Sequence, residues 1–384
     1  MFKKIILSLI LLSSTIWVVY INYEPPVSGF VKQIEKGVLN LKHTVKIVDE
    51  ADTKHSSPYF YSTYSPEDEL YEPVLAIQQE RAYDAVDKLE ELAAQDNADA
   101  LYWLAIITYK SSAFSEQTGA ELFERSAKLG NPYAALMLDE NNYECKTSMP
   151  SHCDKKWGVL AKELLIEREK NGDLEALYSL IPKQLDKASK QDHEKLDKLA
   201  YEGFNQGYLL PLYTLVFIYQ TFDSDSDPDS VYSLTEEERA ILNQLVLIMA
   251  NRHHLASVYN VINNENNTYS EQDIQNVVNS NLHTMGNSYP SVLYYLMDKT
   301  DSSREDQLQL ASFAQVADTY QNSMRKRFFR NYAYSINEDF DEFSEKELGK
   351  IEQLTIENLS KSTPNIYITM GCPRTFGSCL YVDE

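Results

Sequence analysis

Ten residues near the middle of the chain decide the fold: Ala127-Lys128-Leu129-Gly130-Asn131-Pro132-Tyr133-Ala134-Ala135-Leu136. Gly130 can take the left-handed turn that ends one helix, and Asn131 is a favoured N-cap for the next helix. Ala134, four residues after the glycine, is small enough to let two helices approach closely, where a larger side chain would separate them. The stretch therefore predicts two short helices joined by a tight turn.

The same pattern recurs at several places along the chain. It is clear in Ala93–Leu101 and in Gly172–Leu177, and it continues at turns near Gly207, Arg252 and Gly286. The residues expected to pack at the helix crossings are Ala100, Ala134, Ala176, Pro211, Ala256 and Pro290. Successive members of this set are separated by 34, 42, 35, 45 and 34 residues.

Insertions explain the two long separations. The first long unit contains the segment between Cys145 and Cys153, and the second contains the acidic loop Asp223–Ser230. Without them the unit is about 34 to 36 residues, the length of two short helices with their turns. Glycine is scarce, with 12 in 384 residues, so its presence at four of the six turns indicates a genuine repeat. The sequence predicts an all-α protein, an α-solenoid of stacked helix pairs.

Two of these units resemble the Sel-one-like repeat, a relative of the tetratricopeptide repeat. The resemblance is sharpest in Ala127–Leu136 and Glu169–Leu177, and it extends more weakly over residues 70–300. The chain departs from the family at Ser111-Ser112-Ala113-Phe114, where a Gly-x-Gly-Val loop is usual. The family implies a superhelix that binds other proteins, often in bacterial envelopes, and it implies no catalytic residues.

The N-terminal residues 1–23 are predicted to be a transmembrane anchor. Lys3 and Lys4 precede nineteen uncharged residues, Ile5–Tyr23, and such a helix would be roughly 28 Å long, close to the hydrocarbon thickness of a bilayer. The lysines are expected to stay in the cytoplasm, so the rest of this single-pass bacterial inner-membrane protein would face the periplasm. A cleaved signal peptide is the alternative, but no small-x-small cleavage site follows the apolar region.

A stem and a helical body are expected after the anchor. The stem, residues 24–64, begins with Glu24-Pro25-Pro26, which resists helix formation. A helix start is predicted at Ser65-Pro66-Glu67-Asp68, with serine as the N-cap and acidic side chains in the first turn. The solenoid is then expected to span residues 65–360.

The tail, residues 361–384, has a different character. Alternating residues in Ile366–Met370 predict a short strand, followed by a turn that would cap the end of the solenoid. The four cysteines of the chain form two close pairs, Cys145 with Cys153 and Cys372 with Cys379. Zinc sites need closer spacing than these pairs have, and an exported chain favours disulfides, so two local disulfides are predicted.

The charge balance limits the choice of partner. The chain has 35 basic and 58 acidic residues, a formal net charge of -23. Such a surface repels phosphate backbones and anionic lipid, so no nucleic acid is expected as a partner and membrane contact is expected only through the N-terminal helix. A protein partner with a basic surface is expected instead. The 27 tyrosines are suited to anchoring such a partner wherever they face outwards.

One acidic stretch has the spacing of a calcium-binding loop. The residues at positions 1, 3, 5 and 12 of such a loop are Asp225, Asp227, Asp229 and Glu236. Position 6, which should be glycine, is Ser230, and Pro228 is also awkward there. The favoured interpretation is a solvated loop followed by the capping box Ser233-Leu234-Thr235-Glu236. No metal site or cofactor is therefore predicted, and calcium-regulated adhesion remains an alternative.

No set of catalytic residues stands out. His253 and His254 are adjacent, so on a helix they point about 100° apart and do not easily share a metal. Gly286-Asn287-Ser288-Tyr289-Pro290 begins like a nucleophile elbow but lacks the closing glycine. An enzyme is the alternative from another class, and it would need a polar pocket between repeats with a pair of carboxylates of perturbed pKa.

The sequence thus predicts a membrane-anchored, periplasm-facing helical-repeat protein that binds another protein and performs no catalysis. Acidic groups would steer a basic partner to the curved surface, and tyrosines would supply contact energy. The family resemblance also suggests a narrower alternative, an immunity protein that neutralises a periplasm-acting type VI secretion effector such as a phospholipase.

Overall fold

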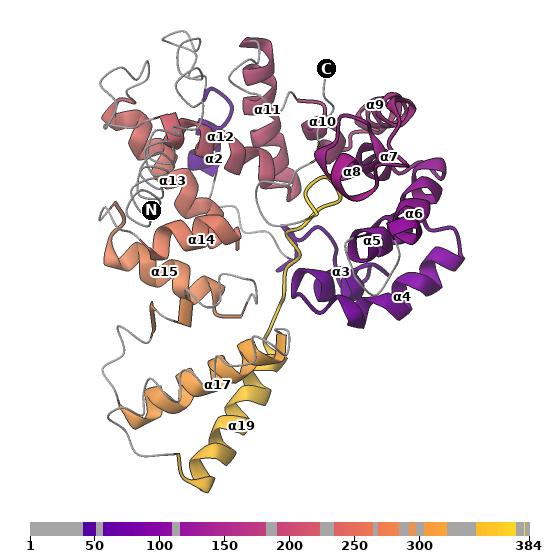
Figure 1. The fold of residues 1–384 in the computed structure, drawn as a ribbon. Coiled ribbons are helices and arrows are strands. Elements are labelled where there is room, and N and C mark those ends of the chain that lie inside the picture. Colours follow the sequence, from indigo (N-terminus) through magenta and orange to yellow (C-terminus); the bar gives the residue numbers. More distant parts are fainter. Residues whose placement is uncertain are drawn as a thin grey trace, which may run out of the picture.

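The computed structural model describes residues 41–50, 57–109, 116–181, 190–222, 234–263, 268–283, 292–293, 295–296, 303–320, 343–373 and 380. All regular elements in these ranges are α-helices, which confirms the all-α prediction (Figure 1). None of the helices in these ranges is both long and apolar enough to cross a membrane. Several predictions concern positions outside these ranges: residues 1–23, Asp225, Asp227, Asp229, Pro290 and Cys379.

The helices follow one another in a curved arc from α3 to α15, consistent with an α-solenoid, and α17 and α19 form a pair below it (Figure 1). Their bounds are α2 (Val45–Glu50), α3 (Tyr71–Gln78), α4 (Ala82–Ala94), α5 (Ala98–Thr108), α6 (Glu116–Lys128), α7 (Pro132–Leu138), α8 (Tyr143–Ser148), α9 (Lys155–Lys170), α10 (Leu174–Ser179), α11 (Lys190–Gln206), α12 (Leu210–Phe222), α13 (Glu236–Asn251), α14 (Leu255–Ile262), α15 (Glu271–Asn281), α17 (Arg304–Tyr320) and α19 (Glu345–Ser360).

A left-handed residue ends the turn before each of α5, α7, α10, α12 and α14. These residues are Asp96, Gly130, Gly172, Gly207 and His253, with φ angles of 60°, 97°, 87°, 87° and 67°. Glycine adopts this conformation without steric cost, and aspartate is among the residues that tolerate it best. Side chains then cap the next helix: Asn97, Asn131, Asp173 and His254 each accept hydrogen bonds from backbone N–H groups of its first turn. The periodicity seen in the sequence is therefore a periodicity of helix-ending turns.

The residues predicted to pack at helix crossings differ in burial. Ala100, Ala134 and Ala176 are fully buried. Pro211 is also buried, whereas Ala256 is half-buried. All five lie in the first turn of their helices, immediately after the turns described above.

Three hydrophobic clusters hold the helices together. The first joins α3 to α9 around Trp103 and Phe123, and it includes Ile366 and Ile368 from the C-terminal segment. The second joins α2 to the helices from α10 to α15. The third lies between α17 and α19. The C-terminal segment is thus part of the main core although it lies nearly 300 residues from α3 in sequence.

The N-terminal part differs from the sequence expectation in two ways. The helix predicted to start at Ser65 begins at Tyr71 instead, because Ser65 and Asp68 close a separate turn through a hydrogen bond of 2.7 Å. Part of the expected stem packs on the body: α2 lies against α11 and α13. It is held there by Asp197 of α11, whose carboxylate accepts hydrogen bonds from the backbone N–H groups of His43 (3.0 Å) and Thr44 (3.1 Å).

The predicted position of the capping box is wrong: the box begins at Thr235, two residues after Ser233. Thr235 is the N-cap of α13, its hydroxyl accepts a hydrogen bond from the N–H of Glu238, and the Glu238 carboxylate accepts one from the N–H of Thr235. Glu236, the expected twelfth residue of a calcium loop, is the first residue of this helix. Its backbone is helical, and the helix start is explained by the cap alone.

The predicted disulfide between Cys145 and Cys153 is present. It closes the connection that contains α8, between α7 and α9. Cys372 is also disulfide-bonded. The connection between α7 and α9 is thus closed on itself.

The strand predicted at Ile366–Met370 is wrong, and so is the expectation that the tail caps the end of the solenoid. Residues 362–369 are extended but form no strand pair with any described residue. From the end of α19 the segment turns back and runs along the inside of the arc, past α3 and α5 towards α8 and α10 (Figure 1). The alternation of apolar residues reflects burial against helices on the inner face.

Candidate binding site on the inner face

The inner face of the arc holds an extended polypeptide, the chain's own residues 363–373, called here the inner segment. Its backbone is bonded mainly by side chains of the helices and of the loop before α3. At its start the hydroxyl of Ser62 accepts a hydrogen bond from the N–H of Ile366 (2.8 Å), and the N–H of Thr63 donates to the Ile366 carbonyl (2.7 Å). The Tyr71 hydroxyl donates to the carbonyl of Pro364 (2.6 Å).

Gln78 at the end of α3 forms a clamp on the inner segment. Its Nε2 donates to the carbonyl of Asn365 at 2.9 Å, and its Oε1 accepts from the N–H groups of Tyr367 at 2.8 Å and Ile368 at 3.3 Å. Gln78 is itself buried. A carboxamide matches a peptide group in donor and acceptor, so one side chain satisfies three backbone groups that could not reach water.

The far end of the inner segment is bonded by residues of the next units. The Tyr102 hydroxyl of α5 donates to the carbonyl of Met370 (2.6 Å). The carboxylate of Glu175 in α10 accepts a hydrogen bond from the N–H of Gly371 (2.5 Å). A Cβ at Gly371 would lie 3.0 Å from Glu175 and 3.2 Å from Tyr133, so glycine allows this close approach.

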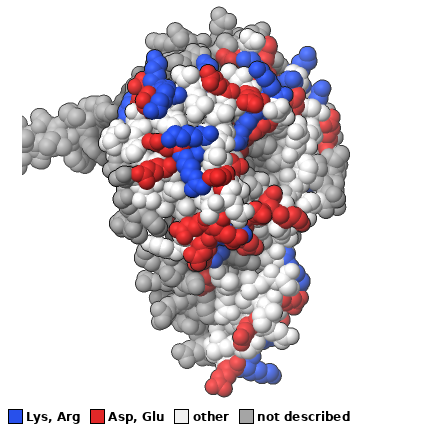
Figure 2. All heavy atoms as spheres, turned by 90° about the vertical axis from the view of Figure 1, so that its right-hand side faces the viewer, with Lys and Arg blue, Asp and Glu red and all other residues white. Residues whose placement is uncertain are grey.

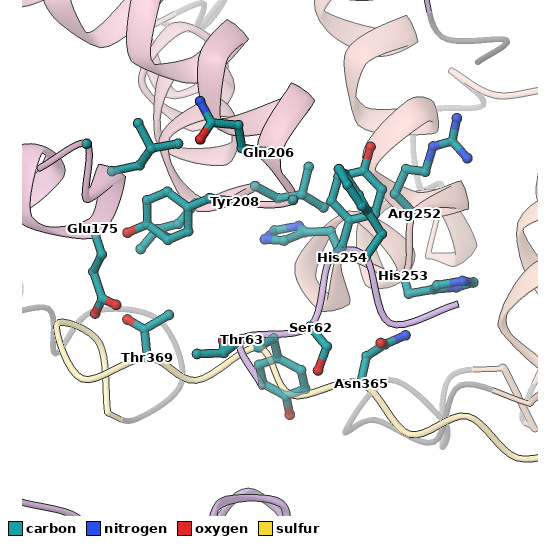
Figure 3. Close-up of a pocket in the computed structure, with 18 residues that line it drawn as sticks. Ser62, Thr63, Glu175, Gln206, Tyr208, Arg252, His253, His254, Asn365 and Thr369 are labelled. Carbon is teal, nitrogen blue, oxygen red and sulfur yellow. The ribbon is translucent and has the colours of Figure 1, made fainter. Parts of the chain in front are cut away.

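A cavity of about 320 Å³ remains between the inner segment and the helices beyond it. Figure 3 shows Glu175 and Tyr208 on one side of it, His253 and Asn365 on the other, and the inner segment along its floor. The residues that line it are Phe60, Tyr61, Ser62, Thr63, Gly172, Leu174, Glu175, Gln206, Gly207, Tyr208, Leu209, Leu210, Arg252, His253, His254, Asn365, Tyr367 and Thr369. Gly172 and Gln206 are exposed, so the cavity opens to solvent.

Glu175 is the only residue that contributes a carboxyl group to this cavity among the described residues. Burial raises its pKa from 4.5 to about 7, against the hydrogen bonds from Gly371 and Thr369, which lower it. Nearby Asp173 raises the pKa further and Arg168 lowers it. The carboxyl group therefore changes its charge near neutral pH. The enzyme alternative required a pair of carboxylates in such a pocket, and the cavity offers one.

The two histidines on the side of the cavity opposite Glu175 are mostly neutral near pH 7. Burial lowers the pKa of His254 to about 3, and it also lowers the pKa of His253. The guanidinium of Arg252 lies over the ring of Tyr61, 6.0 Å from its centroid. In Figure 3 the Arg252 side chain points away from Glu175. The two histidines that the sequence placed at a turn do line a site, but His254 acts there as a helix cap.

Asn365 brings an unsatisfied polar group to the cavity. Its side chain is buried, with 7% of the residue exposed, and neither Oδ1 nor Nδ2 has a hydrogen-bond partner among the described residues. An unpaired buried amide costs about 1–3 kcal/mol, and most such groups in folded proteins are paired with protein, water or ligand. The backbone carbonyl of the same residue is already bonded to Gln78. Both amide atoms are shielded from solvent, so the side chain bonds a molecule in the cavity only when it turns towards that molecule.

An aromatic row leads from the cavity along α12. The ring of His254 lies 4.6 Å from that of Tyr213, which in turn stacks on Phe217 at 6.0 Å. Phe217 is 54% exposed, unusual for a phenylalanine. We call Tyr213 and Phe217 the aromatic row. Sequence reasoning placed aromatic contacts on tyrosines and missed this phenylalanine, whose exposure depends on which side of α12 faces outwards.

Charged side chains of both signs lie on the outer surface. Figure 2 shows acidic and basic side chains interspersed over one side of the molecule, with acidic groups gathered across its middle. On α4 the exposed acidic residues are Asp84, Asp87, Glu90 and Glu91. No group of three or more His, Cys, Asp or Glu side chains that could hold a metal ion occurs among the described residues.

No family model matches this sequence, and no curated protein and no solved structure matches it either. The fold and the inner-face geometry are therefore the basis for the functional argument that follows.

Proposed function

We propose that this chain is a binding protein whose curved inner face recognises extended polypeptide, and that a protein partner lies along the part of this face beyond the inner segment. The observation that carries the proposal is the inner segment itself. Its backbone is held by hydrogen bonds with the side chains of Ser62, Gln78, Tyr102 and Glu175. These bonds are made to the main chain of the segment and do not depend on which side chains it carries. An inner face with this chemistry is suited to other extended segments.

The aromatic row, which continues from His254 of the cavity lining, has the features of a contact surface. The aromatic row offers an exposed ring at Phe217 beside the cavity, and aromatic side chains dominate the energy of protein interfaces. The net charge of -23 favours a partner with basic groups, whose approach it would accelerate.

We further propose that the chain is an exported, periplasm-facing protein, anchored to the bacterial inner membrane by residues 1–23, with a repeat of the Sel-one-like type. The spacing of the left-handed turns at Asp96, Gly130, Gly172 and Gly207 supports the repeat. The disulfide between Cys145 and Cys153 supports an oxidising compartment.

A site-specific cross-linking experiment tests the proposal. A photoreactive phenylalanine derivative is placed at position 217 of the full chain in its native cells, and, as a control, at position 83, where Tyr83 is 77% exposed on α4. We expect one discrete adduct from position 217 and not from position 83. Mass spectrometry then maps the cross-linked segment of the partner.

The mapped segment provides the decisive measurement. A synthetic peptide of that segment should bind the purified protein, and Phe217→Ala should weaken binding about tenfold or more, since a buried aromatic anchor is worth roughly 2 kcal/mol. Tyr83→Ala should leave the affinity unchanged. The proposal would be contradicted by adducts that form equally at both positions, or by a peptide that binds Phe217→Ala as tightly as it binds the unmodified chain.

A further inference from the structure

The cavity beside the inner segment has two chemically distinct ends. One end holds the Glu175 carboxyl and the Tyr208 ring, and the other holds the unsatisfied amide of Asn365 (Figure 3). Thr369, which hydrogen-bonds Glu175, lies four positions after Asn365 along the extended chain. Extended chain rises about 3.3 Å per residue, so the two ends are roughly 13 Å apart along the segment. A ligand that satisfies both ends must combine a cation with an amide.

The Asn365 end of the cavity favours a ligand that contains a peptide group. A carboxamide with a free donor and a free acceptor pairs with the N–H and carbonyl of a polypeptide, and Gln78 makes this pairing with the inner segment in the same groove. Asn365, a residue of the inner segment itself, carries an equivalent carboxamide and lines the cavity. A second extended strand of polypeptide is the natural partner for it.

The carboxyl end favours a basic side chain. Glu175 has carboxylate oxygens with more acceptor capacity than its bonds to Gly371 and Thr369 use, and the adjacent Tyr208 ring adds a face suited to a cation. Arg168 is the one cation that acts on Glu175 among the described groups, and its guanidinium already lies 3.9 Å from the carboxylate of Asp99 and 4.0 Å from that of Asp173. Burial raises the pKa of both Tyr64 and Tyr133, so these are neutral at pH 7.

From these two ends we infer that the cavity receives a basic side chain of an extended polypeptide partner, with the cation bound by Glu175 and an adjacent peptide group bound by the amide of Asn365. The inference rests on the proposed function and names the chemistry of the partner at one position. The cavity volume of about 320 Å³ lies at the small end of ligand pockets, which suits one side chain with its neighbouring backbone.

Binding of a cation should be linked to ionisation of Glu175. The group is about one-tenth ionised at pH 6 and about nine-tenths ionised at pH 8 if its pKa is about 7. Affinity for a cation should therefore rise about tenfold over this range, since only the ionised fraction is competent. His253 and His254 have lowered pKa values and stay neutral over most of the range. The charged groups that act on Glu175 are Asp173 and Arg168, and Arg252 lines the cavity.

A blocked tetrapeptide serves as the probe: N-acetyl-Ala-Arg-Ala-Ala-amide, compared with the same peptide containing citrulline, which is nearly isosteric but uncharged. Affinities are measured by nuclear magnetic resonance titration of the exported chain, following the side-chain amide signal of Asn365. We expect saturable binding of the arginine peptide, binding about tenfold weaker for the citrulline peptide, and a tenfold gain between pH 6 and pH 8.

Variants test the role of Glu175 and of Asn365 at the two ends of the cavity. Glu175→Gln should lower the affinity for the arginine peptide about tenfold and abolish its pH dependence, and Asn365→Ala should weaken both peptides. Glu163→Gln, an identical charge change at an exposed site on α9, should leave all affinities unchanged. The pH series and the citrulline comparison on the unmodified chain need no variant to fold.

Three results would overturn the inference: no saturable binding of the arginine peptide, equal affinity for the two peptides, or affinity for the arginine peptide that is constant from pH 6 to pH 8. None of these bears on cross-linking at position 217, which lies on the aromatic row outside the cavity lining. Failure here with a positive result there would remove the cavity as the cation site and leave the proposed binding function standing.

Discussion

The side-chain amide of Gln78 donates a hydrogen bond of 2.9 Å to the backbone carbonyl of Asn365, 287 positions further along the chain. The same carboxamide accepts from two backbone N–H groups of the following residues. The first helix of the arc is thereby tied to the last described segment of the chain. The arc is closed on its inner side by polar contacts as well as by the apolar core.

Gln78→Ala should destabilise the protein by about 3 kcal/mol, because it leaves three buried backbone groups without partners. Urea unfolding monitored by circular dichroism gives the free energy of unfolding. Glu72→Ala, at an exposed position of the same helix, is the matched control and should change stability by less than about 0.5 kcal/mol. Equal small effects of the two variants would mean that the inner segment is held by its apolar side chains alone.

The helical content and the helix-ending turns could be predicted from sequence because both are determined by neighbouring residues. A helix-ending residue such as Gly130 and the cap at Asn131 lie next to each other, and their spacing along the chain is visible without a structure. The path of residues 363–373 could not be predicted in this way. Its partners, such as Gln78 and Tyr102, are more than 250 residues away, and an alternating apolar pattern fits burial against helices as well as it fits a strand.

Asp197 should be essential for holding α2 on the body. Its side chain is 1% exposed and accepts hydrogen bonds from the backbone of His43 and Thr44 and from the His43 ring (2.7 Å). Asp197→Ala removes this acceptor and leaves buried N–H groups unpaired, so we expect a loss of about 2 kcal/mol or more. Hydrogen exchange should show faster exchange in Val45–Glu50.

The control for this prediction is Glu194→Ala, three residues earlier on an exposed side of α11. It should leave the exchange of α2 unchanged. If α2 kept its protection in Asp197→Ala, its attachment would be due to apolar contacts such as those of Ile47, which is fully buried.

Glu175 should make stability depend on pH in the window between its unfolded and folded pKa values. The folded pKa, about 7, is raised above the ordinary 4.5, so the folded state binds more protons than the unfolded state between these values. The contribution is fully present below pH 4.5 and is lost as pH rises through 7, an effect of the order of 3 kcal/mol. Stability should therefore fall across this window because of this group.

Comparison with Glu175→Gln isolates this effect from other carboxyl groups. The glutamine stays neutral, and its oxygen can still accept from the N–H of Gly371, so the difference in unfolding free energy should grow in favour of the variant from pH 5 to pH 8. Urea unfolding at four pH values measures it. A difference that is constant with pH would show that the Glu175 carboxyl is not desolvated as the cavity geometry implies.

The candidate site shows why a sequence reveals function less readily than fold. His253 and His254 were visible as a pair at a turn, but nothing near them in sequence identifies Glu175 or Asn365 as their neighbours across a cavity. Glu175 lies within the repeated turn sequence Glu169–Leu177, and its neighbours in sequence give no sign of a cavity. Its raised pKa depends on the inner segment that covers it, and that segment was itself misplaced by the sequence prediction.

The disulfide between Cys145 and Cys153 should stabilise the connection around α8. It closes a loop with a sequence separation of 8, for which the loss of chain entropy in the unfolded state amounts to about 2.5 kcal/mol. The double variant Cys145→Ala, Cys153→Ala should lose roughly this amount in urea unfolding. A loss below about 0.5 kcal/mol would indicate that the loop is already ordered in the unfolded state.

Ala134 gives a test of the expectation that small residues pack at the helix crossings. It is fully buried in the first turn of α7, and its N–H donates to the cap residue Asn131 at 2.9 Å. Alanine and leucine have similar helix propensities, so Ala134→Leu should not weaken the helix itself. Extra carbon atoms at a filled crossing displace backbone, and we expect a loss of about 1–3 kcal/mol.

The equivalent position in a later unit supplies the control. Ala256 is half-buried, so Ala256→Leu can turn its added atoms towards solvent and should cost less than about 1 kcal/mol. Both free energies come from urea unfolding of the full chain under the same conditions. A cost at Ala134 no larger than at Ala256 would show that the recurring small residues follow the composition of the turns and not a steric requirement of the crossings.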